Sequence, residues 1–146
     1  MYKQTVFSVQ GRHNLIRDEW KGELYKYITG IVKSNDQKLY IINGMPDHVH
    51  VLLSLKPDAA VSDLVRDIKA NSSKFINEKR WITGKFQWQE GFGAFSYGHS
   101  QLDTVIKYIK DQEEHHRKKT FKEEYLEFLK KFNVQYNEQY LFTWIE

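Results

Sequence analysis

The sequence predicts an α+β fold of the ferredoxin-like type, an antiparallel β-sheet with two helices on one face. The patterned segments follow in the order strand, helix, hairpin, helix, strand, and a short turn with Gly and Pro closes the hairpin. No repeat, linker or low-complexity stretch interrupts the 146 residues. We therefore expect one domain over residues 1–146.

The first strand and helix are predicted from their apolar positions. Residues 3–9 carry Val6, Phe7 and Val9 and are typical of a strand. Residues 17–32 have apolar side chains at helical spacing. These side chains are Trp20, Leu24, Tyr27, Ile28 and Ile31.

The central hairpin is predicted over residues 38–43 and 48–55, with a turn at 44–47. A second helix follows, for which Ser62 is the expected N-cap. Its apolar stripe consists of Leu64, Val65, Ile68, Phe75 and Ile76. Arg66, Lys69 and Lys74 lie on its polar side, where a solvated face is the simplest interpretation.

The rest of the chain is expected to add a strand and helices. Residues 86–97 are rich in aromatic side chains and predict a strand or hairpin. Helices are expected over about 100–118 and over 121–132, and residues 140–142 could form a short edge segment.

The composition limits the classes of function. The net charge of +3 suits an anionic partner, although a protein that binds DNA non-specifically is usually more basic. The absence of Cys excludes disulfides and thiolate metal sites. We expect a cytoplasmic protein without a membrane partner, because no stretch resembles a signal peptide or a membrane span.

Two histidines stand out in the predicted strand 48–55. His48 and His50 project from the same face, because alternate side chains of a strand point to opposite faces. Histidine is the commonest protein metal ligand, so the pair could form half of a metal site. The alternative is that both are ordinary, half-exposed strand histidines.

The helix expected near residues 100–118 carries two further candidates. Tyr108 and Gln112 are four residues apart and stack on one side of this helix, beside its apolar stripe. They could reach a site next to the sheet. The alternative is a boundary tyrosine and a solvated glutamine.

Taken in order, these segments resemble the single-tyrosine HUH transposases of the IS200-like and REP-associated kind. The resemblance depends on the histidine segment 43–52, the aromatic–glycine segment 88–96 and the tyrosine segment 108–112, with further likeness at 5–9 and 68–73. His-x-His alone is a weak motif, whereas the ordered combination is specific. The chain differs in having fewer residues before its first strand.

The resemblance implies an HUH endonuclease fold and a metal-dependent DNA transposase. His48, His50 and Gln112 would bind Mg²⁺ or Mn²⁺, and Tyr108 would be the nucleophile. Its attack on single-stranded DNA would give a 5′-phosphotyrosine and a free 3′-OH.

The resemblance also implies a hairpin in single-stranded DNA as the partner, with Arg12, Lys69 and Lys74 as candidate DNA contacts. One tyrosine can hold only one DNA end covalently, so cutting both ends of an element needs two subunits. We therefore expect a homodimer. Its active sites would be composite, with the Tyr108 helix beside the partner's histidine strand. Gly91, Gly93 and Gly98 precede this helix, and their backbone freedom would let the connecting segment place the helix away from its own sheet.

Two other functions compete with this interpretation. Histidine-triad nucleotide hydrolases carry a third histidine on the strand, but this chain has Leu52 there. A domesticated, non-mobile protein that only binds hairpin DNA is the alternative within the same fold. The presence of all four candidates, His48, His50, Tyr108 and Gln112, favours the enzyme.

Overall fold

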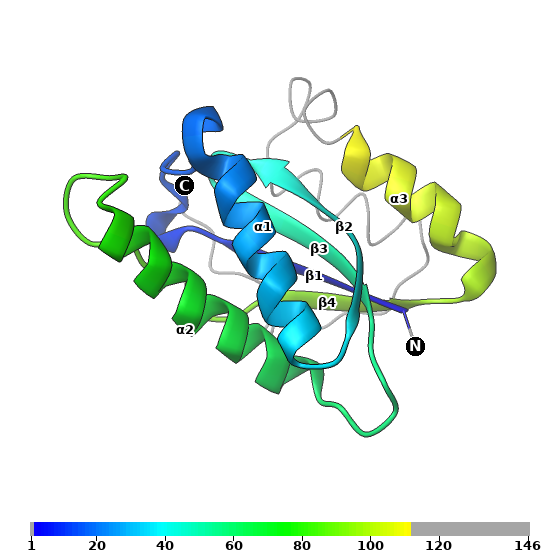
Figure 1. Ribbon diagram of the computed structural model, residues 1–146. Helices are drawn as coiled ribbons and strands as arrows, with labels where there is room; N and C mark the ends of the chain where they lie inside the picture. The colour runs from blue at the N-terminus through cyan, green and yellow to red at the C-terminus, as the bar shows by residue number, and fades with distance from the viewer. Residues whose placement is uncertain (1, 112–146) are drawn as a thin grey trace.

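A computed structural model of the chain describes residues 2–111, which form a four-stranded antiparallel sheet and three α-helices (Figure 1). The sheet has the strand order β2-β3-β1-β4, which confirms the predicted ferredoxin-like fold. The elements are β1 (Tyr2–Ser8), α1 (Asp18–Ser34), β2 (Lys38–Met45), β3 (His48–Ser54), α2 (Val61–Lys79), β4 (Gly93–Tyr97) and α3 (Leu102–Lys110), with 3₁₀ turns at Gln10–Arg12 and His99–Gln101.

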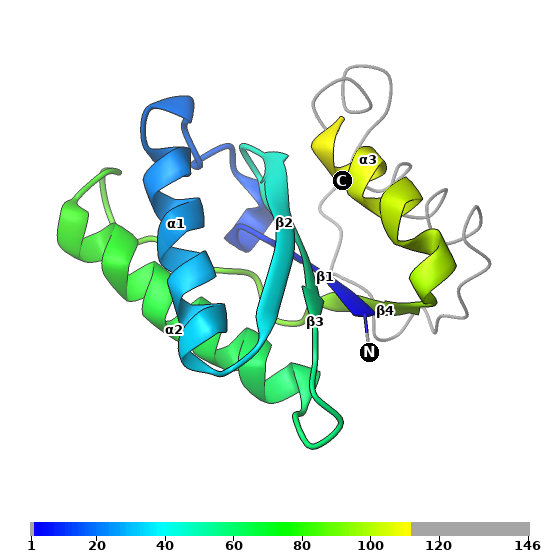
Figure 2. The same cartoon turned by 45° about the vertical axis from the view of Figure 1, so that its right-hand side comes forward.

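The helices cover the two faces of the sheet unequally. Helices α1 and α2 lie side by side on one face, and α3 lies on the other face beside β2 (Figure 2). Because strand side chains alternate, each of β1 and β3 contributes to both layers. Most side chains that β1 and β3 send to the α1/α2 face are buried and apolar, among them Phe7, Val49, Val51 and Leu53, and Thr5 is a buried polar exception.

The predicted helical stripes are largely confirmed. Five apolar residues of α1 are buried, and Tyr27 lies at the edge of this stripe, 37% exposed and stacked on Phe75 of α2. The prediction that Ser62 caps α2 is wrong. Ala60 occupies the N-cap position in an extended conformation, so Ser62 lies one residue inside the helix.

The hairpin turn is shorter than predicted. β2 runs to Met45, and only Pro46 and Asp47 connect it to β3. Gly44 is therefore a strand residue that pairs with Val49, where a Cβ atom would lie 2.2 Å from the carbonyl oxygen of His48. Close approach of two backbones, and not a turn conformation, accounts for this glycine.

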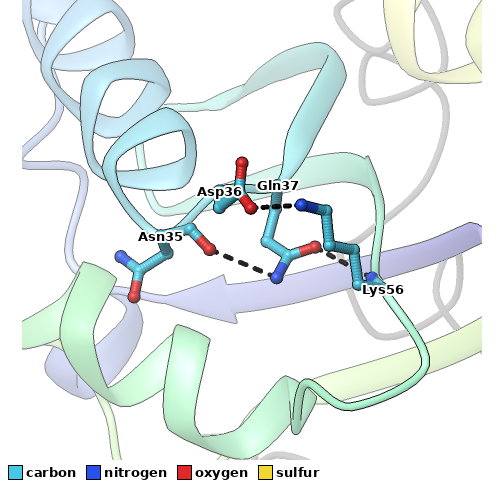
Figure 3. A network of polar contacts seen from close by, with 4 residues as sticks. All are labelled: Asn35, Asp36, Gln37 and Lys56. Carbon is cyan, nitrogen blue, oxygen red and sulfur yellow. Dashed lines mark hydrogen bonds and ion pairs between the residues drawn. The ribbon is translucent and has the colours of Figure 1, made fainter.

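The opposite end of the hairpin is held by a polar network (Figure 3). Gln37 Oε1 accepts from the backbone N–H of Lys56 at 2.9 Å, and Gln37 Nε2 donates to the carbonyl of Asn35 at 3.2 Å. Lys56 also forms an ion pair with Asp36, which has a positive φ of 60°. This network ties the α1–β2 turn to the segment that leaves β3.

The C-terminal half of the described chain departs most from the predicted boundaries. Only residues 93–97 of the predicted 86–97 segment form β4, although Trp88 makes an isolated bridge to Val9. Helix α3 ends at Lys110, before the predicted 118, and Asp111 leaves the helical conformation at ψ 18°. The elements expected at 121–132 and 140–142 lie outside the described residues. Within residues 2–111, no helix is long and apolar enough to cross a membrane.

Candidate active site

The two strand histidines lie in the interior, on the face of the sheet that carries α3. His48 is 0% exposed and His50 is 3% exposed, so neither is a half-exposed surface histidine. Their ring centroids are 5.2 Å apart. A buried polar ring costs free energy unless its nitrogens are satisfied, so the partners of these rings decide what the pair can do.

Asp47 fixes the orientation of His48. Its Oδ1 atom lies 2.7 Å from His48 Nδ1, and both side chains are buried. A carboxylate can only accept a hydrogen bond, so Nδ1 carries a proton, and in the neutral ring Nε2 then carries the lone pair. A histidine held in this way by a carboxylate is the usual arrangement around a bound metal ion.

His50 has a neutral partner instead of a carboxylate. Gln4 Nε2 of β1 lies 2.6 Å from His50 Nδ1, and the hydroxyl of Tyr97 in β4 donates to Gln4 Oε1 at 2.7 Å. Gln4 is fully buried, and Tyr97 is 6% exposed. Three strands thus contribute to the surroundings of this one imidazole.

Helix α3 is tied to the histidine hairpin at its C-terminal end. Asn43 of β2, the register partner of His50, donates from Nδ2 to the carbonyls of Ile109 and Lys110 at 3.1 and 3.2 Å. Both carbonyls belong to the last turn of α3, where carbonyl groups have no acceptor role within the helix itself, so Asn43 caps this end. The half-buried Tyr108 immediately precedes this contact and packs against the core.

The predicted metal ligands are only partly within the described chain. His48 and His50 share one face of β3, whereas Gln112 lies outside residues 2–111. No group of three or more His, Cys, Asp or Glu side chains arranged to hold a metal ion occurs within these residues. The chemistry of the donors nevertheless fits a divalent cation, because two imidazoles share one rigid strand and the carboxylate of Asp47 accepts from Nδ1 of His48, as partners of metal-binding histidines do.

The predicted DNA contacts on α2 lie away from the histidines, since α2 covers the opposite face of the sheet. Lys69 donates from Nζ to the carbonyls of Gln89 and Gly91, and burial lowers its pKa to about 8, with Glu90 opposing the shift. Lys74 is exposed and lies 4.0 Å from Glu78. Arg12 is in a 3₁₀ turn, and its side chain is outside the description. A role of these residues in DNA binding stays a prediction.

The residues that support the histidines were not assigned roles from the sequence. Asn43 and Asp47 belong to the quoted histidine segment, and a polar residue directly before His48 is a usable signal. Gln4 and Ser8 share one strand face with Val6 between them, and Lys3 and Thr5 on the other face are also polar, so the pattern of the first strand did not mark Gln4. Nothing local in the sequence connects Tyr97 with Gln4, because their contact depends on strand pairing.

Comparison with known proteins decides the family. Residues 1–112 match the family described as "Transposase IS200 like". The chain belongs to the IS200-like transposase family. The matched region includes His48, His50, Tyr108 and Gln112, and it covers the whole described fold.

Individual relatives agree with this assignment. The ISDra2 transposase TnpA of Deinococcus radiodurans is 27% identical over 114 residues, which cover 73% of this chain and 80% of that protein. A crystal structure from Deinococcus radiodurans R1, assigned as a transposase, has a TM-score of 0.62 at 22% identity, over 77% of this chain and 90% of that one.

A second solved structure is a REP-associated tyrosine transposase bound to a REP hairpin. It has a TM-score of 0.59 at 14% identity, over 75% of this chain and 64% of that one. At these identities the two structures are evidence for the fold alone. They confirm the predicted α+β fold of the HUH type.

Proposed function

We propose that this IS200-like transposase cleaves and rejoins single-stranded DNA at the ends of a mobile element, with Tyr108 as the nucleophile. The observation that carries the proposal is the contact of Asn43 with the end of α3. It brings the helix turn that bears Tyr108 onto the sheet face of His48 and His50. The family match favours transposition over the alternative of a non-mobile hairpin-DNA-binding protein.

The proposed reaction is a transesterification at phosphorus. The Tyr108 hydroxyl oxygen forms a bond to the scissile phosphorus and loses its proton to water, while the bond from phosphorus to the 3′ oxygen breaks. The leaving oxygen takes up a proton, which gives a free 3′-OH and a 5′-phosphotyrosine. Since the phosphodiester energy is retained, a 3′-OH can later attack the phosphotyrosine and rejoin the strands without ATP.

His48, His50 and Gln112 would hold a divalent cation, Mg²⁺ or Mn²⁺. Both metals accept oxygen ligands, and Mn²⁺ accepts imidazole readily. When bound, such a cation supplies Lewis-acid stabilisation of charge on the scissile phosphate and helps a phenol, with an ordinary pKa near 10, to react as phenolate. Asp47 keeps the His48 ring in the required tautomer and orientation.

The proposed substrate is single-stranded DNA beside a hairpin, and the proposed assembly is a homodimer. A fold neighbour bound to a REP hairpin supports the first part. In the single chain, α3 packs on the sheet of its own chain (Figure 2). Tyr108 and the histidine strand of one chain therefore lie on the same face of that sheet. If α3 were exchanged between subunits, the chain would have to change direction at residues 98–101, which connect β4 to α3. Gly91 and Gly93 could not serve as this hinge, because they come before or at the start of β4, which is paired with β1.

Covalent capture tests the nucleophile. A single-stranded oligonucleotide that carries the hairpin and cut site of the element should form an adduct with the wild-type chain that survives denaturation. Tyr108→Phe should bind this DNA equally well and form no adduct, because only the hydroxyl is removed. Tyr27→Phe, at an exposed tyrosine of α1, is the matched control and should react like the wild type. An adduct with Tyr108→Phe would refute the assignment.

A further inference from the structure

The hydrogen-bond chain that reaches His50 determines where its ring proton lies. Gln4 receives a hydrogen bond on Oε1 from Tyr97 and so presents its amide nitrogen to His50 Nδ1, at 2.6 Å. An amide nitrogen only donates, so Nδ1 is the acceptor. The neutral His50 ring therefore carries its proton on Nε2.

The two histidines consequently have opposite tautomers. Asp47 keeps the His48 proton on Nδ1, so a ligand would meet the Nε2 lone pair of the neutral His48 ring. His50, with Nδ1 occupied by Gln4, would meet a ligand with its Nε2–H group. Since a metal ligand must present a lone pair, His50 cannot bind a cation through Nε2 in this state.

We propose that Gln4 is a positioning residue whose side-chain amide turns over when a cation binds the histidine pair. After the turn, Gln4 Oε1 accepts a hydrogen bond from His50 Nδ1–H, and Gln4 Nε2 donates to the hydroxyl oxygen of Tyr97. The imidazole gains no net proton, because one proton is lost from Nε2 and one is taken up at Nδ1 through water. The inference rests on the proposed metal site and deepens it.

The side chains of Gln4 and Tyr97 are both suited to a reversal of the Gln4 amide. A primary amide presents a donor and an acceptor that exchange places when it turns over, and a phenol hydroxyl can donate or accept. Both contacts are therefore kept in either state, which matters because an unsatisfied buried polar group costs about 1–3 kcal/mol. A carboxylate at position 4 would serve only the metal-binding state, as Asp47 does for His48.

The tautomers can be measured directly in the full chain labelled with ¹⁵N-histidine. Two-bond ¹H–¹⁵N correlation spectra distinguish Nδ1–H from Nε2–H, and His50→Gln identifies the His50 signals. Without metal we expect Nε2–H at His50 and Nδ1–H at His48. With Mg²⁺, which is diamagnetic, we expect His50 to change to Nδ1–H while His48 keeps its tautomer.

The outcomes separate this inference from the proposed function. If Mg²⁺ shifts the His48 and His50 signals but His50 is already Nδ1–H without metal, the turning amide is refuted and the metal site stands. If Mg²⁺ moves neither set of signals, the proposed metal site fails, and the inference fails with it. A change of tautomer at His50 alone on adding Mg²⁺ supports both.

Two variants at position 4 test whether Gln4 sets the tautomer. In Gln4→Glu the carboxylate can only accept a hydrogen bond, so His50 should carry its proton on Nδ1 before any Mg²⁺ is added. The added negative charge by itself would not fix the proton on Nδ1. Gln4→Met keeps the length of the side chain but removes its hydrogen bonds. It should weaken Mg²⁺ binding by about tenfold, the lower end of effects seen for residues behind a ligand. Wild-type Mg²⁺ affinity in both variants would overturn the proposal.

Discussion

Strand β3 sends only apolar side chains to the α1/α2 face of the sheet, whereas its α3 face carries both histidines, with the polar Gln4 and Ser8 of β1 beside them. On the face of α1 and α2, Phe7, Val51 and Leu53 are fully buried and require only close packing. On the face of α3, Gln4 and His48 are equally buried, and the Gln4 amide and His48 Nδ1 are hydrogen-bonded. The same two strands thus serve a packing layer and a chemical layer.

The two layers contribute differently to the free energy of folding. Each fully buried aliphatic or Phe side chain contributes about 1.5–3 kcal/mol, whereas a typical hydrogen bond adds only about 0.5–1.5 kcal/mol net. We infer that the α1/α2 face supplies most of the stability. The histidine face gives up part of this stabilisation to hold rings in fixed orientations.

The largest expected effect is loss of activity when residues on the histidine face are changed. The same variants, combined in one dimer, show whether one chain or two chains form each active site. Homodimers of His48→Ala with His50→Ala, and homodimers of Tyr108→Phe, should each form no covalent adduct. A mixed dimer of the two variants holds one complete site only if Tyr108 acts beside the partner's histidines. We expect adduct formation to return in the mixed dimer, measured on the first cleavage step.

The converse outcome is equally informative. If the mixed dimer stays inactive while a dimer with one wild-type chain is active, each chain uses its own α3 as the single chain places it (Figure 1). The composite site would then be wrong, and the assignment of Tyr108 would be unaffected.

The packing face should respond in the opposite way. Leu53→Ala removes a fully buried side chain from the α1/α2 side of β3 and should lower the free energy of unfolding by about 3 kcal/mol. Adduct formation per folded molecule should be unchanged, because Leu53 points away from the histidines. Urea unfolding followed by an activity assay below the transition measures both. A comparable loss of activity in the folded fraction would contradict the separation of the two faces.

The packing face was the more predictable of the two. The strand and helix patterns of Phe7, Leu24 and Ile68 depend on local periodicity, and they lead to the observed sheet and buried stripes. The same holds for the shared face of His48 and His50, which follows from their spacing. Hence the fold, and one half of the site, could be read from short stretches of sequence.

The support of the site depends on long-range pairing and was not predictable in this way. Tyr97 meets Gln4 across 93 positions of sequence, and Asn43 meets Ile109 across 66. The end of α3 was missed for the same reason, since the side chain of Asn43, far away in the sequence, donates to the carbonyls of its last turn.

The contact between β2 and α3 should have an intermediate effect. Asn43→Ala removes the donor to two carbonyls and should cost about 1 kcal/mol of stability, as loss of a helix cap does. We expect Asn43 to cap whichever α3 docks on its sheet, from its own chain or from the partner. Adduct formation should therefore fall about tenfold, since about 1.4 kcal/mol of lost positioning corresponds to that factor. Asn43→Asp has nearly the same shape but cannot donate, so it should behave like Asn43→Ala. Wild-type rates in both would show that this contact does not position Tyr108.

The smallest effect concerns Lys69, on the packing side of the sheet. Burial lowers its pKa from 10.5 to about 8, so between these values the unfolded chain binds a proton that the folded chain does not. The free energy of unfolding should therefore rise with pH from about 8 to 10.5, relative to Lys69→Met. The slope should stay well below the limit of about 1.4 kcal/mol per pH unit for one proton, because the ammonium is partly solvated. Lys74→Met, at an exposed lysine of the same helix, should leave the slope unchanged, and urea titrations across this pH range make the comparison. A wild-type slope in Lys69→Met would show that the buried ammonium is not its source.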